Sequence, residues 1–455
     1  MTGFSAIILA AGKGTRMSSP LPKVVHPVAG RPIIERVVRA AKEAGAADVR
    51  VIVGFGETLV RQIVEPMGAH CFRQERQLGT ADAVRAAQVD SLEGVVIIMN
   101  GDHPLLETMD IAKFRTDFAA TKADIAVVTC ELKEPGQFGR IVRNQGAVRA
   151  IVEAKDASHE ACKIKEVNTG IYIMKAESLI DLLPRIESQN AQGEFYLTDL
   201  IELAVDDGLK IEGLRASPRV ALGVNTQAEL ANATRLAFRR KAQRLLESGV
   251  ILMDPRTTYI EDSVAVAPAA TIFPNVHLRG TSRVGAFTCI ESGCVITDSE
   301  IADNVHIRAG SYMDRAKVGA NAQVGPYAHL RPGTDIGEDC KVGNFVEMKK
   351  VKFGKGAKAG HLTYLGDAEV GENTNIGCGT ITCNYATDHK KYVTKIGKDV
   401  FVGSDSQFVA PVEIGDGAII GSGSTITKNV PAGALAVGRA RQFVKENYVS
   451  KKKDK

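Results

Sequence analysis

A six-residue repeat in the second half of the chain constrains the fold more than any other feature. Successive hexads begin with an apolar residue, most often followed by glycine, at Val318, Val324, Leu330, Ile336 and Val342, and again at Ile396, Val402, Phe408, Ile414, Ile420 and Ile426. This repeat is typical of a parallel β-helix, in which every coil buries the repeated side chain and stacks on the next. An ordinary β-sandwich would not keep its apolar residues in this phase.

The phase of the repeat fails between Ile376 and Ile396. The intervening segment, residues 382–395, is polar and contains Asn384, Tyr385, Asp388 and His389. A polar insertion in a strict solenoid has to leave the stack as a loop, and loops on rigid scaffolds often carry binding groups. We therefore expect a functional loop at this point.

The first half of the chain has a different period, in which short apolar runs alternate with helical patterns. Four continuous apolar runs have the length of buried strands, at residues 6–10, 49–53, 95–99 and 125–130. Between the first two runs, residues at helical spacing predict a helix with Pro32 in its first turn and Gly45 at its end; they are Ile33, Ile34, Val37, Val38 and Ala41. This alternation predicts a Rossmann-like α/β domain with a mostly parallel sheet, which binds ligands at the carboxyl ends of its strands.

A long helical pattern over residues 226–246, closed by Gly249, separates the two halves. Its expected inward positions are Leu230, Ala233, Leu236, Ala237 and Ala242. We therefore expect an α/β domain at residues 1–227, a linker helix at 228–250, a β-helix at 251–439 and a basic tail at 440–455.

Composition excludes several classes of protein. The 455 residues carry a formal net charge of +4, and the lysine-rich last five residues supply most of it. A short basic run of this kind is more often a solvated tail than a nucleic-acid-binding site. No apolar run approaches the roughly 18 residues that span a bilayer, and we see no export signal. The eight cysteines form no CxxC pair. We expect a cytoplasmic protein with reduced thiols, no membrane span and no nucleic-acid partner.

Two short segments in the first half carry the chemistry of phosphate binding. Residues 9–16, Leu-Ala-Ala-Gly-Lys-Gly-Thr-Arg, directly follow the first strand, and the N–H groups around Gly12 and Gly14 can line a polyanion. Their spacing fits neither the P-loop nor GxGxxG. Asp102 follows the strand at residues 95–99, where a single carboxylate suits Mg²⁺ together with phosphate oxygens. The alternative for both segments is an ordinary turn.

Longer motifs carry a resemblance to known families. Residues 9–16, followed by Leu21-Pro22-Lys23, resemble the sugar-1-phosphate nucleotidyltransferases, and the hexads resemble the left-handed parallel β-helix family. Further motifs extend the resemblance over the whole chain except its tail, to bacterial bifunctional enzymes that join a uridyltransferase to an acetyltransferase. These motifs lie at residues 74–80, 138–141, 151–155, 167–170, 193–199, 330–333, 344–350, 359–367 and 375–385.

This resemblance implies two successive reactions in a homotrimer whose acetyltransfer sites lie between subunits. An acetyl group would pass from acetyl-CoA to glucosamine-1-phosphate. A Mg²⁺-dependent uridylyl transfer from UTP to N-acetylglucosamine-1-phosphate would follow, giving UDP-N-acetylglucosamine and pyrophosphate. The product would feed peptidoglycan and lipopolysaccharide synthesis.

The resemblance also implies roles for individual residues. In the first domain, the uracil and ribose would contact Leu9, Ala10, Ala11, Gly12, Gln74, Gly79 and Thr80. The phosphates would contact Arg16 and Lys23, and the acetylated sugar would contact Gly139, Glu153, Asn168 and Asn225. Mg²⁺ would bind to Asp102 and Asn225. In the second domain, the aminosugar phosphate would contact Arg331, Lys349, Tyr364, Asn375, Asn384 and Tyr385, and the coenzyme Cys378, Ser404, Ser422 and Arg439. Asn100 would also belong to the nucleotide and sugar site, at a position where the family commonly has Tyr, and the family commonly has Ala at position 378.

His361 is the expected general base of acetyl transfer. An ammonium group has no lone pair, so a base that titrates near neutral pH helps the amine to attack a thioester. Ala359 occupies the inward hexad position, so His361, two residues on, should face outward. A structural histidine is the alternative from residues alone, and the motif Gly-His-Leu-Thr-Tyr-Leu-Gly around it favours the catalytic role.

Other readings stay open at this point. A nucleotidyltransferase that makes ADP-glucose also joins this fold to a β-helix, although without the segment around His361. The β-helix could serve only as an oligomerisation scaffold, with Arg331 and Lys349 as ordinary solvated charges. A covalent acetyl-cysteine at Cys378 or Cys383 is disfavoured, because the amine can attack the thioester directly.

Overall fold

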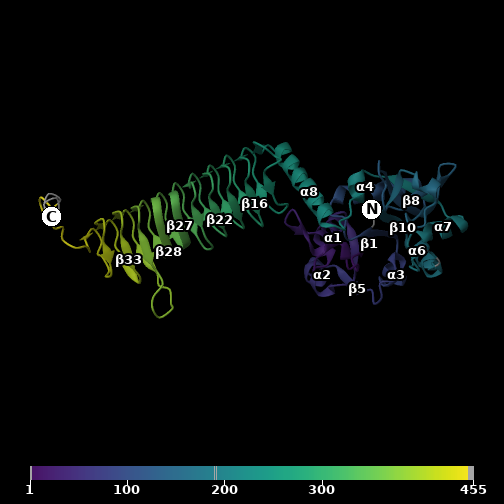
Figure 1. The fold of residues 1–455 in the computed structure, drawn as a ribbon, viewed down its shortest axis with the longest axis horizontal. Coiled ribbons are helices and arrows are strands. Elements are labelled where there is room, and N and C mark those ends of the chain that lie inside the picture. The colour runs from purple at the N-terminus through teal and green to yellow at the C-terminus, as the bar shows by residue number, and fades with distance from the viewer. Residues whose placement is uncertain (1–2, 189, 191, 449–455) are drawn as a thin grey trace, which may run out of the picture. The chain divides into compact units, whose positions relative to one another are not determined.

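The computed structural model describes residues 3–188, 190 and 192–448, and the chain divides into two compact units of residues 1–237 and 238–455. Figure 1 shows the α/β unit and the stacked coils of the second unit. Lys451 and the rest of the basic run expected to form a solvated tail lie outside the described residues.

The first unit is built on a sheet with the strand order β11-β7-β10-β6-β1-β4-β5. Its strands are β1 (Phe4–Leu9), β4 (Ala46–Val53), β5 (His70–Arg73), β6 (Val95–Asn100), β7 (Ile125–Glu131), β10 (Glu166–Lys175) and β11 (Ile211–Arg215). The four strands expected from the apolar runs are confirmed. The sheet is parallel except at β10, which runs antiparallel to β6 and β7, and at the hairpin of β8 (Arg140–Asn144) and β9 (Ala147–Val152).

Helices cover both faces of this sheet because successive strand residues point to opposite sides. Ile8 packs in one core cluster, with residues of α1 (Ile33–Glu43), α2 (Glu57–Val64) and α4 (Thr108–Thr121). Ile7 packs in the other cluster, with residues of α3 (Thr80–Arg85), α6 (Ala176–Leu182) and α7 (Asp199–Asp206). The unit also contains β2 (Pro27–Val28), β3 (Arg31–Pro32), α5 (His159–Cys162) and short 3-10 helices.

The inward pattern predicted for helix α1 is confirmed, whereas Pro32 precedes the first turn and does not lie in it. All five of its expected inward residues are buried. Pro32 immediately precedes the helix, and Gly45 follows it with φ of 91°, a conformation that glycine adopts at low cost.

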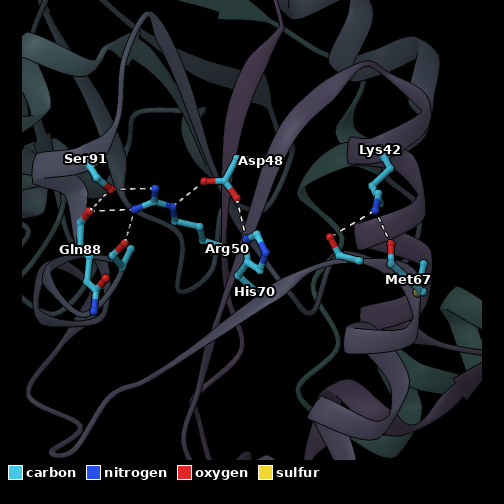
Figure 2. A network of polar contacts seen from close by, with 9 residues as sticks. Lys42, Asp48, Arg50, Met67, His70, Gln88 and Ser91 are labelled. Atoms are coloured by element: carbon cyan, nitrogen blue, oxygen red, sulfur yellow. Dashed lines mark hydrogen bonds and ion pairs between the residues drawn. The ribbon is translucent and has the colours of Figure 1, made fainter.

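A buried arginine ties three segments of this unit together (Figure 2). The Arg50 guanidinium on β4 donates to Asp48 (2.7 Å), to the carbonyls of Ala87 and Gln88 (2.7 Å each) and to Ser91 Oγ (2.9 Å). Asp48 also contacts the exposed His70 ring at 3.1 Å. Burial opposes ionisation of Asp48, yet these two partners leave the pKa of its carboxyl below the usual value. The network satisfies polar groups that the packing would otherwise leave unpaired.

The second unit is a parallel β-helix, as the hexads predict. Strands pair in parallel with the strand three places later in the chain, for example β13 (Tyr259–Ile260) with β16 (His277–Arg279) and β16 with β19 (Val295–Thr297). Twenty-six strands join in this sheet within the described residues, from β12 (Ile251–Leu252) to β37 (Leu435–Ala436). The repeated hexad residues are buried in one continuous core.

Close stacking of the coils requires glycine at Gly343. A Cβ atom there would lie 1.8 Å from the carbonyl oxygen of Gly360 in the next coil. Both glycines lie in the long strands β27 (Lys341–Phe353) and β28 (Lys358–Val370), which pair over most of their length. This contact places Asn344 beside His361 in register.

The interruption of the repeat is shorter than the sequence indicates. Thr382 lies in β30 (Ile381–Cys383) and is buried at an inward position, where its hydroxyl donates to the Gly366 carbonyl at 3.0 Å. Lys395 lies in β31 (Thr394–Ile396). The expected loop is therefore residues 384–393, which leave the stack beside β28 (Figure 1). A hydroxyl that bonds to the backbone can replace the aliphatic residue of a hexad, which hides the strand from an apolar pattern.

The helix between the two halves is α8 (Gln227–Glu247). The Thr226 hydroxyl accepts from the Glu229 N–H at 3.2 Å, and Gly249 follows the helix with φ of 88°. Of the expected inward residues, Ala233, Ala237 and Ala242 are buried, whereas Leu230 and Leu236 are half-buried. Leu245 is buried although the pattern did not include it.

Two further expectations concern the chain as a whole. No helix among the described residues is long and apolar enough to cross a membrane. All eight cysteines are free thiols, and burial raises the pKa of Cys294 and Cys340 to about 11, so these two are poor nucleophiles.

We predict that Arg50→Met destabilises the α/β unit by about 2–3 kcal/mol, because two backbone carbonyls and Asp48 lose their donor in a poorly hydrated place. Hydrogen-exchange mass spectrometry of β4 and β5 measures the loss. The matched control is His70→Ala, which removes an exposed partner of the same carboxylate and should cost less than about 1 kcal/mol. Equal effects of the two substitutions would contradict this account of the network.

Candidate active sites

A cavity of about 440 Å³ lies where β1 and β6 end in the α/β unit. Ten of the residues expected to bind the nucleotide or metal line it: Leu9, Ala10, Ala11, Gly12, Lys23, Gln74, Gly79, Thr80, Asn100 and Asp102. Gln77 and Glu194 also line it. They lie in the motifs at residues 74–80 and 193–199, but no role was predicted for either side chain. Arg16 is exposed and does not line this cavity.

Backbone contacts bring the two phosphate-binding segments together. The Gly101 N–H donates to the Leu9 carbonyl at 2.8 Å, which joins the turn after β6 to the end of β1. Gly14 has φ of 64°, and a Cβ there would lie 2.8 Å from Cβ of Lys23. Glycine at this position therefore lets the loop lie against the Lys23 stem, and this stem leads its ammonium toward Asp102.

The Lys23 ammonium is the charged centre of this cavity. It forms an ion pair with Asp102 Oδ2 and donates to Asn225 Oδ1 at 2.9 Å. Burial by itself would raise the pKa of Asp102, but the adjacent ammonium outweighs this effect and leaves the pKa below its usual value. Asp102 therefore presents a carboxylate at neutral pH.

The donor atoms around Lys23 fit a divalent cation. The Asp102 carboxylate and the Asn225 amide oxygen come from segments far apart in the chain and converge on a single positive charge. Asp102 Oδ1 is buried and has no hydrogen-bond partner. Mg²⁺ commonly takes one or two protein oxygens and completes its shell with water and phosphate. No group of three or more His, Cys, Asp or Glu that could hold a metal occurs among the described residues.

His103, which follows Asp102 in the chain, is a further neighbour of this site. Its side chain is buried, and Nε2 lies 3.6 Å from Asp102 Oδ1. Burial, reinforced by the Lys23 charge, lowers the pKa of His103 despite the adjacent carboxylate. The ring is therefore neutral at neutral pH and leaves Lys23 as the cation that balances Asp102.

The residues expected to hold the acetylated sugar form a second group. The Asn168 N–H donates to the Gly139 carbonyl at 2.9 Å, and a Cβ at Gly139 would lie 3.3 Å from the Glu153 carboxylate. Burial raises the pKa of Glu153. The Asn168 amide oxygen accepts from the Gly170 N–H at 2.8 Å, and Asn100 packs against Gly170. Asn100 thus lies between this group and the main cavity.

In the β-helix, His361 is exposed, as its position two residues after Ala359 predicts. Its Nδ1 lies 2.5 Å from the amide oxygen of Asn344 in the preceding coil. An amide oxygen only accepts, so this contact assigns the proton to Nδ1 and leaves Nε2 with a lone pair. Asn344 had no assigned role in the sequence analysis, because only the register of the coils reveals its contact with His361.

Three cations gather around Lys349 on β27. Arg331 donates to Glu347 at 2.7 Å, whereas Lys349 lies against Lys391 from the loop at residues 384–393. The Lys391 amine, followed by Arg331, lowers the pKa of Lys349. Like charges held together in this way favour an anion between them. Lys391 was missed because one more lysine in a polar loop carries no distinctive signal.

The loop is organised as a short hairpin around the expected substrate residues. Tyr385 pairs with Lys391 in an isolated antiparallel bridge, and its hydroxyl lies 2.8 Å from His389 Nδ1. The Asn384 amide donates to Asp367 at 2.5 Å, and both the amide and the Tyr364 hydroxyl lie within 3 Å of the Cβ position of Gly366. Asn375 lies apart from these residues, on β29 (Asn375–Ile376) of the neighbouring face.

The residues expected to contact the coenzyme form one column along a corner of the β-helix. The Asp405 N–H donates to the Cys378 carbonyl at 2.7 Å, and the Gly423 N–H donates to the Ser404 carbonyl at 2.8 Å. The Arg439 guanidinium donates to the Ser422 carbonyl at 2.7 Å. In the other direction the Gly379 N–H donates to the Leu362 carbonyl at 3.0 Å, so the column leads to the residue next to His361.

Family profiles match both units of the chain. A MobA-like NTP transferase domain matches residues 6–166, a GMPPB C-terminal domain matches residues 257–353, and a bacterial transferase hexapeptide (six repeats) matches residues 394–428.

Relatives match over nearly the full length, and each is named bifunctional protein GlmU. The protein from Bdellovibrio bacteriovorus is 63% identical over 447 residues, covering 98% of both chains. The protein from Pelobacter propionicus is 45% identical over 460 residues and covers all of both chains, and the protein from Acinetobacter baylyi is 43% identical and covers 98% of both. With a nucleotidyltransferase domain followed by hexapeptide repeats, the chain therefore belongs to the family of bifunctional GlmU proteins.

Proposed function

We propose that the chain acetylates glucosamine-1-phosphate with acetyl-CoA in its β-helix and then uridylylates N-acetylglucosamine-1-phosphate with UTP in its α/β unit. The products are UDP-N-acetylglucosamine, a cell-wall precursor, and pyrophosphate. The observation that carries the proposal is the presence on one chain of two kinds of site: a centre of carboxylate, amide and ammonium groups in the α/β unit, and a β-helix that carries both the His361–Asn344 pair and a cluster of three cations.

Acetyl transfer follows from the arrangement around His361. Arg331, Lys349 and Lys391 hold the phosphate, and the corner column of Cys378, Ser404, Ser422 and Arg439 holds the coenzyme. Nε2 of His361 accepts a proton from the amine as the nitrogen attacks the thioester carbonyl. The tetrahedral adduct collapses, the C–S bond breaks, and the coenzyme leaves as a thiolate that takes up a proton.

Uridylyl transfer needs no protein nucleophile, because positioning and charge stabilisation suffice. A phosphate oxygen of the acetylated sugar attacks the α-phosphorus of UTP, and the bond to pyrophosphate breaks. Mg²⁺ held by Asp102 and Asn225 supplies positive charge to the phosphate oxygens. Arg16 and Lys23 add further charge, the backbone at Gly12 lines the phosphates, and Gly139, Glu153 and Asn168 orient the sugar.

We also propose a cytoplasmic homotrimer with the acetyl-transfer sites between subunits. An exposed apolar corner beside His361, formed by Tyr327, Phe345 and Leu362 of successive coils, supports assembly. The rings of Tyr327 and Phe345 stack with centroids 5.7 Å apart. All three residues have φ between 43° and 56°, the left-handed conformation that Phe287 and Asn304 also adopt in earlier coils.

The test is a coupled assay with glucosamine-1-phosphate, acetyl-CoA, UTP and Mg²⁺ that follows UDP-N-acetylglucosamine. Omission of acetyl-CoA should stop product formation, and supplied N-acetylglucosamine-1-phosphate should restore it. Asp102→Ala should lower uridylyl transfer by about a hundredfold or more and leave acetyl transfer unchanged, whereas His361→Ala should do the reverse. Equal loss of both activities in either folded variant would refute the division of labour.

We predict that Asn344→Leu lowers kcat of acetyl transfer by about tenfold or more, because the proton of His361 is no longer fixed on Nδ1. Release of the free coenzyme thiol measures the rate, and uridylyl transfer by the same preparation reports that the protein is folded. Asn344→Asp retains an acceptor and should recover part of the rate. A positioning role fails if Asn344→Leu keeps the full rate.

A further inference from the structure

The metal ligands expected in the α/β unit already have a cation between them. The Lys23 ammonium pairs with Asp102 Oδ2 and donates to Asn225 Oδ1 at 2.9 Å. These are the two side chains that the proposed function assigns to Mg²⁺. One ammonium group therefore makes contacts that a divalent ion would need to make with the same oxygens.

Other charged groups do not share this role with Lys23. Among the described residues, Asp102 has ion-pair contacts with Lys23 and His103 only, and His103 Nε2 lies 3.6 Å from Oδ1, on the other oxygen of the carboxylate and beyond hydrogen-bond distance. Asp102 is 9% exposed, so water screens its charge poorly. A Lys23 side chain that leaves this carboxylate without a replacement cation would expose an unpaired buried charge, which is costly.

We propose that Lys23 is an internal cation that occupies the divalent-metal position of the nucleotide-free protein and competes with the metal for Asp102 and Asn225. The inference rests on the proposed function for the identity of the metal site. Two cations cannot share the same oxygens at contact distance without strong repulsion. Divalent ions therefore bind the free protein weakly, because each binding event has to expel the ammonium.

Nucleotide phosphates would relieve this competition. They offer the ammonium a new set of negative oxygens close by, in the same cavity that Lys23 and Gly12 line. A ligand that draws Lys23 away raises metal affinity at Asp102, and metal binding raises the affinity for that ligand by the same factor. Lys23 thereby couples occupancy of the metal site to occupancy of the nucleotide site.

The test measures Mn²⁺ binding to the full chain without nucleotide, by the electron paramagnetic resonance signal of free Mn²⁺. Lys23→Met should bind Mn²⁺ about tenfold more tightly than the wild type or better, because the competing charge is gone. Lys23→Gln is a second neutral variant, and Lys23→Arg keeps the charge and should bind as weakly as the wild type. The matched control is Lys13→Met, which changes net charge equally in the same loop but removes an ammonium that lies over the Phe55 ring, 5.6 Å from its centroid.

The Asp102→Asn variant distinguishes a failure of the metal site from a failure of the competition by Lys23. If Asp102→Asn weakens Mn²⁺ binding relative to the wild type while both neutral Lys23 variants bind no more tightly than the wild type, competition by Lys23 is refuted and the metal site stands. If Mn²⁺ binding is unchanged by Asp102→Asn, the metal site itself is refuted. If Lys13→Met raises the Mn²⁺ affinity as much as Lys23→Met does, the change in net charge alone explains the effect, and the inference is overturned. Thermal unfolding of each variant without Mn²⁺ establishes that it is folded.

Discussion

The in-register stacking of β-helix coils is the constraint on which the second site depends. Strands of successive coils pair in parallel, so residues at the same corner of these coils lie one above the other. This stacking places Asn344 under His361 and aligns Cys378, Ser404 and Ser422 in one column. A repeat whose apparent purpose is to fill a narrow core thus also fixes the geometry of an exposed catalytic corner.

The first site depends on a different constraint, the adjacency of parallel strands. Because β1 and β6 are neighbours and end at the same edge, the glycine loop and Asp102 meet over one cavity. Lys23 then joins Asp102 to Asn225, although these residues are 79 and 202 positions away from it in the chain. Both metal binding in the proposed mechanism and the competition by Lys23 require that Asp102 is a buried carboxylate paired with a cation.

Much of this architecture could be predicted from the sequence, because period and burial are local properties. The hexads predict the β-helix, the apolar runs predict the strands, and the phase at Ala359 predicts that His361 faces outward. Contacts that depend on three-dimensional register could not be predicted in this way. Asn344 and Lys391 are ordinary residue types at unremarkable positions, and only folding brings them to His361 and Lys349. The inward position of Thr382 was not predicted, because its hydroxyl bonds to the backbone where an apolar side chain would be expected.

The central claim is that two independent sites on this chain perform consecutive reactions through a released intermediate. Mixing the Asp102→Ala and His361→Ala proteins tests it most directly, with glucosamine-1-phosphate, acetyl-CoA, UTP and Mg²⁺ supplied. Each variant alone should form almost no UDP-N-acetylglucosamine, and the mixture should restore its formation after a lag, because one protein makes the intermediate that the other consumes. A mixture as inactive as either variant alone would contradict the account.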